Sequence, residues 1–162
     1  MPSKTRLRNY TSGVAAEKSI TLIERMIAEF GASNVSKDYD AGLCVRMTFD
    51  IVDPESAMPL HIVLDANEAA VCKALRRPGF QTDRQLQATK QQARRTAWKN
   101  MFELLSIQLT MLKLKQRSIL QSFLSETVTP SGKPVHQIMA ESRVLIPEQS
   151  GTLNDDVEVV EQ

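Results

Sequence analysis

The sequence contains few of the residues that build disulfide frameworks, metal centres or phosphate-binding loops. Its 162 residues include two cysteines, two histidines and six glycines. Cys44 and Cys72 form no CxxC pair, which argues against a zinc site or a disulfide framework and fits a reducing cytoplasm. His61 and His136 have no Glu or Cys at the spacing of a metal ligand set. We therefore expect no bound metal and no cofactor.

The motifs of nucleotide-binding loops and hydrolases are also lacking. Every glycine is isolated, so neither GxGxxG nor GxxxxGK[ST] occurs, and there is no GxSxG. Asp50, Asp53 and Glu55 gather at the end of a predicted strand, where acids are common, so a metal or acid–base site there is the less favoured interpretation. No residue stands out as one that performs chemistry, and we expect a protein that is not an enzyme.

Long apolar segments are lacking as well. No run approaches the roughly 18 residues that a membrane-spanning helix needs. Residues 1–8 are basic without an apolar segment behind them, unlike a secretory signal. Apolar residues make up 42% and charged residues 24% of the chain, which excludes a wholly disordered protein. We expect one cytoplasmic domain without a membrane segment.

The charges, in contrast, are strongly segregated along the chain. The formal net charge is +1, but residues 1–72 carry −3, residues 73–117 carry +9 and residues 118–162 carry −5. A block of +9 raises the local concentration of polyanions around it. The alternative interpretation of the same block is the solvated face of a long helix.

Hydrophobic periodicity predicts an α+β fold, in which a three-stranded antiparallel sheet packs against an N-terminal helix and a long helix in the C-terminal half. The expected order is α-β-β-β-α-α-α: a helix over 13–30, strands over 33–39, 43–52 and 59–64, and helices over 66–76, 83–115 and 118–126. We place a single domain at 13–139, a flexible basic segment at 1–12, and an acidic tail, expected to be disordered, at 140–162.

Alternation in the middle strand and capping residues at the helix ends support these assignments. The side chains expected to face the core from the middle strand are Leu43, Val45, Met47, Phe49 and Ile51. Ser12 is expected to cap the first helix and Gly31 to end it. Capping boxes are expected at Asp65 with Glu68 and at Ser118 with Gln121.

The helix over 83–115 is the longest expected element, because no Gly or Pro occurs from Thr82 to Thr129. Its apolar stripe consists of Trp98, Phe102, Leu105, Leu109 and Leu112. At 1.5 Å per residue it is roughly 50 Å long, more than the roughly 30 Å of a small domain. We therefore expect part of this helix to contact a second subunit or another partner.

One constellation could carry function. Cations and glutamines alternate around the Pro78-Gly79 break and the start of the long helix, with Phe80 and Trp98 nearby. Such cations neutralise phosphates, and an exposed aromatic ring can stack on a base. We expect Trp98 in the core and leave Phe80 open. The candidate nucleic-acid-binding residues are Lys73, Arg76, Arg77, Arg84, Lys90, Arg94, Arg95 and Lys99.

Several segments resemble a group of small, mostly uncharacterised α+β proteins of tailed phages, prophages and integrative elements of bacteria. They are residues 14–20, 30–32, 39–40, 59–64, 66–67, 71–75, 97–99, 108–109, 123–124 and 129–132, so that the resemblance covers roughly residues 11–139. Two features depart from it: Leu104 stands where a tryptophan is expected, and the acidic residues 141–162 look like an addition. The resemblance implies a phage or mobile-element origin and supplies no catalytic residues.

Two functional hypotheses follow from these patterns. The first is a non-enzymatic nucleic-acid-binding accessory protein of a phage or mobile element, acting in the host cytoplasm through the basic helix face. The alternative is a protein-interaction module, either a homo-oligomeric scaffold or an inhibitor of a host or defence protein. The sequence leaves open whether the nucleic acid is DNA or RNA, single- or double-stranded.

Overall fold

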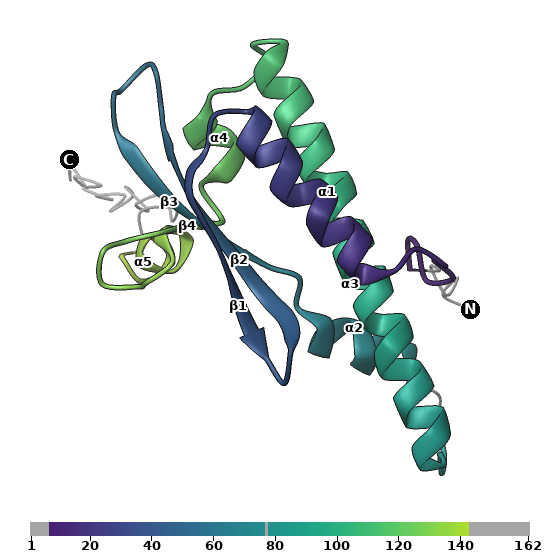
Figure 1. The fold of residues 1–162 in the computed structure, drawn as a ribbon. Coiled ribbons are helices and arrows are strands. Elements are labelled where there is room, and N and C mark those ends of the chain that lie inside the picture. Colours follow the sequence, from purple (N-terminus) through teal and green to yellow (C-terminus); the bar gives the residue numbers. More distant parts are fainter. Residues whose placement is uncertain (1–6, 77, 143–162) are drawn as a thin grey trace, which may run out of the picture.

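The computed structural model describes residues 7–76 and 78–142, and it has the expected α+β architecture (Figure 1). A sheet forms one layer, and helices α1 and α3 lie side by side on one of its faces (Figure 1). The elements are α1 (Ala16–Glu29), β1 (Ser33–Asp40), β2 (Leu43–Val52), β3 (Pro59–Asp65), α2 (Glu68–Leu75), α3 (Asp83–Lys113), α4 (Ile119–Phe123), β4 (Thr127–Val128) and α5 (Val135–Glu141).

The sheet is antiparallel in the order β1-β2-β3-β4, so the three expected strands are confirmed and a fourth is added. Strand β4 has two residues, and its Thr127 and Val128 pair with Ile62 and His61 of β3. The Thr127 hydroxyl also donates to the carbonyl of Phe123, 2.7 Å away. Elements as short as β4 and α5 produce no readable periodicity, which is why the sequence did not reveal them.

In strand β2, buried and exposed side chains do not alternate over the whole of 43–52, although the sequence predicted that they would. Met47, Phe49 and Ile51 are buried as expected, but Leu43 and Val45 are exposed and Cys44 is buried in their place. The register with β1 shifts at this point, because Asp38 pairs with Arg46 while the next residue, Tyr39, pairs with Cys44. A bulge of this kind turns the side chains that precede it to the opposite face of the sheet.

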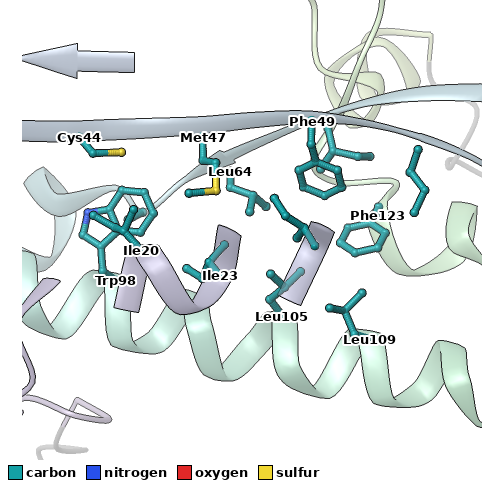
Figure 2. Close-up of a cluster of buried hydrophobic side chains, with 14 of the residues drawn as sticks. Ile20, Ile23, Cys44, Met47, Phe49, Leu64, Trp98, Leu105, Leu109 and Phe123 are labelled. Atoms are coloured by element: carbon teal, nitrogen blue, oxygen red, sulfur yellow. The ribbon is translucent and has the colours of Figure 1, made fainter. Parts of the chain in front are cut away.

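The core lies between the sheet and the pair α1 and α3 (Figure 2). Trp98 is fully buried beside Ile20 and Cys44, as expected for the residue that opens the apolar stripe of α3. At the other end, the rings of Phe49 and Phe123 meet edge to face with centroids 6.0 Å apart. Along α3, Leu105 and Leu109 are buried, whereas Phe102 and Leu112 are partly exposed at the margin of the core.

Helix ends follow the sequence in part. Gly31, with φ of +99°, ends α1 and adopts the left-handed region that favours glycine. The capping box of Ser118 with Gln121 is confirmed. Two caps are corrected: α1 begins at Ala16 without a side-chain cap, and the cap of α2 is Asn67 rather than Asp65. The expected partner of Asp65, Glu68, is thereby free to interact elsewhere.

Residues at the two ends of the proposed domain also find places in the structure. In the segment 7–12, which we placed outside the domain, the Asn9 amide donates to Asn100 at 2.8 Å and the Asn9 carbonyl accepts from Thr96 at 3.0 Å. At the other end, α5 extends to Glu141. Residues 1–6 and 143–162, which hold the rest of the basic segment and nearly all of the acidic tail, lie outside the described residues.

Candidate nucleic-acid interface

The eight cations singled out in the sequence separate into three groups in the structure. Lys73, Arg76, Arg84 and Lys90 are exposed, and none forms an ion pair or side-chain hydrogen bond with another described residue. Arg94 is buried, and Arg95 and Lys99 are partly buried on another side of α3. Arg77 lies outside the described residues.

Three of the four exposed cations line one groove between α2 and the N-terminal half of α3. The groove has a volume of about 620 Å³. Lys73 and Arg76 come from α2 and its C-terminal end, and Lys90 faces them from α3. The complete lining is Leu43, Glu68, Ala69, Cys72, Lys73, Arg76, Gln87, Lys90, Gln91 and Arg94. The structure therefore brings three cations of the +9 block to one groove.

Arg94 lies at the end of this groove, but its charge is neutralised within the fold. Its guanidinium donates to Glu68 and, at 2.7 Å, to the carbonyl of Cys44. It also donates to Glu17 of α1 at 3.2 Å. The same Glu68 oxygen accepts the indole N–H of Trp98 at 2.8 Å. The residue is only 8% exposed, so it is a structural cation and not one available to a polyanion.

This ion-pair network ties four elements together. Arg94 on α3 contacts Glu17 on α1, Glu68 on α2 and the backbone of β2. The pKa of Glu17 is held below its ordinary value, first by its own backbone N–H in the first turn of α1 and then by Arg94, against the opposing effect of burial. Because Glu68 is the first residue of α2, the network fixes where α2 sits against α3 and so sets the width of the groove.

Arg95 and Lys99 occupy a different face of α3. Arg95 follows Arg94 by about 100° around the helix, and its guanidinium donates to Gln92 at 2.9 Å. Lys99 lies 3.7 Å from the carboxylate of Glu103 and 4.7 Å from the centre of the Phe102 ring. Neither residue lines the groove. The structure therefore separates these two cations from Lys73, Arg76 and Lys90.

The loop between α2 and α3 presents an aromatic ring at a second hollow, which is lined by Gln85, Thr89 and Gln92 of α3 and shares no lining residue with the groove. Phe80 is 96% exposed, which answers the question that the sequence left open. The preceding Gly79 has a φ of +100°, and Thr82 starts α3 with a complete capping box to Gln85. Arg84 is exposed in the first turn of the helix, four residues after Phe80.

Sequence reasoning missed the floor of the groove. We use this name for the apolar lining residues Leu43, Ala69 and Cys72, whereas Gln87 and Gln91, also in the lining, belong to the glutamines that alternate with the cations in the sequence. Leu43 is 47% exposed. The signal for its position is the bulge in β2, which depends on pairing with β1 and cannot be read from the strand alone.

The remaining polar candidates take part in local hydrogen bonds of the sheet and its turns. His61 Nδ1 lies 2.5 Å from a carboxylate oxygen of Asp50, and hydrogen bonds from Asn34 and His61 hold the pKa of Asp50 below its ordinary value. Asp53 accepts bonds from the backbone and hydroxyl of Ser56, which closes the turn after β2. Within residues 7–76 and 78–142, no three His, Cys, Asp or Glu side chains are arranged to hold a metal ion.

Helices of sufficient length and apolarity to cross a membrane are absent from the described part of the chain. Comparisons with protein-family models, curated proteins and solved structures gave no significant match to this chain.

Proposed function

We propose that the protein is a non-enzymatic nucleic-acid-binding accessory protein of a phage or mobile element, acting in the host cytoplasm through the groove between α2 and α3. The single observation that carries this proposal is the convergence of Lys73, Arg76 and Lys90 on one groove without a carboxylate partner among the described residues. A cation that is already paired within the protein adds little to the binding of a new anion. An unpaired cation can neutralise a phosphate and release the counterion that the phosphate held.

The wall and the rim of the groove supply further groups suited to this ligand. Gln87 and Gln91 can donate to phosphate oxygens or base edges beside the cations. Outside the groove, Phe80 is exposed in the loop before α3, where it lines a separate hollow, and Arg84 is exposed in the first turn of α3, so a strand bound in the groove would have to continue past the start of α3 to reach them. Spaced cations together with an exposed aromatic ring are typical of single-strand binding, in which phosphates follow the positive charge and a base stacks on the ring.

Replacement of Phe80 by alanine tests the stacking contribution. Stacking of a base on an aromatic side chain is worth about 1–3 kcal/mol, so the variant should bind single-stranded DNA or RNA roughly 5- to 150-fold more weakly. Fluorescence anisotropy of labelled oligonucleotides at low salt measures the change. The ring is 96% exposed, so the melting temperature should stay that of the wild type.

A matched control uses another exposed aromatic residue. Tyr39 is 60% exposed on β1 and does not line the groove. Tyr39→Ala should leave the affinity unchanged. Equal affinities for Phe80→Ala and wild type would remove the ring from the interface, and no binding of wild type to any single- or double-stranded DNA or RNA would refute the proposed function.

One observation favours the second candidate function, a protein-interaction module. The C-terminal half of α3 presents an apolar stripe on its solvent side, formed by Leu104, Ile107, Met111 and Leu114. Leu104, Ile107 and Leu114 are 46%, 53% and 62% exposed. The spacing of three, four and three residues is that of a helix–helix seam. A second copy of the chain would supply a matching stripe.

Two charge insertions test this alternative. If the stripe pairs two copies, wild type sediments as a dimer and Leu104→Glu with Ile107→Glu sediments as a monomer, because two carboxylates would be desolvated in the seam. Val52→Glu with Met58→Glu is the matched control, since these residues are 58% and 53% exposed elsewhere. A wild-type protein that stays monomeric at high micromolar concentration contradicts pairing through this stripe.

A further inference from the structure

The groove between α2 and α3 has a feature that phosphate binding does not require. Besides the cations, its lining includes the floor residues Leu43, Ala69 and Cys72. Leu43 is 47% exposed at the start of β2, next to the buried Cys44. A surface that combines an apolar floor with a cationic rim is complementary to a peptide in which acidic and apolar side chains lie close together.

This chain carries such a peptide at its C-terminus. Residues 143–162, which lie outside the described residues, contain five Asp or Glu and one Arg and are therefore acidic. The last ten residues, 153–162, combine apolar and acidic side chains. The apolar members are Leu153, Val157, Val159 and Val160, and the acidic members are Asp155, Asp156, Glu158 and Glu161.

The length of the intervening chain limits where the acidic segment can bind. The described structure ends at Ser142, directly after α5. Twelve residues, 143–154, separate it from Asp155 and span up to about 40 Å when extended. Helix α3, with 31 residues, is about 46 Å long and is the longest element of the fold. Binding in the groove of the same molecule therefore requires the groove to lie within about 40 Å of Ser142.

We propose that residues 153–161 of the same chain occupy the groove between α2 and α3, with their carboxylates against Lys73, Arg76 and Lys90 and their apolar side chains on the floor. The contact is an intramolecular one and does not depend on the proposed function. Where that function holds, the segment competes with nucleic acid for the same cations, so the inference adds regulation to that site.

Cys72 provides a direct readout of this contact. Its side chain is partly exposed and lines the floor, whereas Cys44, the other cysteine, is buried and burial raises the pKa of its thiol. A neutral maleimide should therefore label one thiol per chain. In full-length wild type at low salt, labelling of Cys72 should be at least about five-fold slower than in the variant Asp155→Asn, Asp156→Asn, Glu158→Gln.

The matched control removes three negative charges elsewhere. Asp38, Asp40 and Glu55 are exposed, so Asp38→Asn, Asp40→Asn, Glu55→Gln changes the net charge equally and should label as slowly as wild type. The slow rate should not depend on protein concentration and should rise with salt, because the contact is ionic and intramolecular. Equal rates in wild type and the tail variant overturn the proposal, as does protection that appears only at high protein concentration.

Nucleic-acid titration then separates the two proposals. The tail variant should bind single strands more tightly than wild type, while the control variant should not. Thiol protection without nucleic-acid binding by either protein would keep the intramolecular contact and refute the proposed function. If the tail variant binds nucleic acid as wild type does, and Cys72 of wild type is not protected from labelling, the intramolecular contact is refuted and the proposed function stands.

Discussion

Arg94→Met is expected to destabilise the fold by about 3 kcal/mol, because it removes a buried guanidinium and leaves the partly buried Glu68 carboxylate and the carbonyl of Cys44 without that donor. The carboxylate of Glu68 would retain only the indole N–H of Trp98, and the carbonyl of Cys44 would lose its donor. In a domain of this size, such a loss lowers the melting temperature by roughly 10 °C. Thermal unfolding followed by circular dichroism measures it.

Two further variants show whether the loss comes from the network. Arg84→Met removes an exposed cation of the same helix that has no ion-pair partner among the described residues, and it should change the free energy of unfolding by less than about 0.5 kcal/mol. Adding Glu68→Gln to Arg94→Met should recover part of the lost stability, because no uncompensated charge is then buried. Equal stabilities for Arg94→Met and Arg84→Met would contradict the structural role of Arg94.

The second large effect concerns binding. Replacing Lys73, Arg76 and Lys90 together by glutamine should lower the affinity for a single-stranded oligonucleotide about 100-fold at low salt, since each lost contact to a phosphate is worth about 1 kcal/mol or more. All three side chains are exposed and without ion-pair partners among the described residues. The melting temperature should consequently remain close to that of wild type. Anisotropy titration gives the affinities.

The same helix offers a matched control for this triple variant. Lys113, Lys115 and Arg117 are exposed at and beyond the C-terminal end of α3, at the other end of the helix from the groove. Changing these three residues to glutamine removes the same charge but should lower the affinity much less. A control variant that loses as much affinity as the groove variant would show that binding depends on net charge and not on the groove.

The sequence predicted those parts of the fold that depend on residues within a single helix or strand. The isoleucines of α1, the alternation of Met47, Phe49 and Ile51 in β2 and the absence of Gly and Pro in α3 all act within one element, and the structure has these elements. The position of Leu43 was predicted wrongly because the bulge that exposes it requires β1 as a partner. Strand β4 was missed because two residues carry no period.

The candidate site was predictable only in part, for a related reason. A sequence shows that Lys90, Arg94 and Arg95 are cations on one helix, but not which of them meets a carboxylate. Arg94 is neutralised by Glu17 and Glu68, which are 77 and 26 residues away in the chain. Its burial follows from the packing of α1, α2 and β2 together. The groove itself depends on the same packing, since its lining comes from α2, α3 and the start of β2.

The central claim, that the cations of the groove meet phosphates, is tested most directly by the salt dependence of binding. For a single strand, the logarithm of the affinity should fall with the logarithm of the salt concentration with a slope of about −0.7 for each neutralised phosphate. Three groove cations and Arg84 predict a slope of roughly −3 for wild type and close to −1 for the variant with glutamine at positions 73, 76 and 90. Parallel lines for the two proteins would contradict the account.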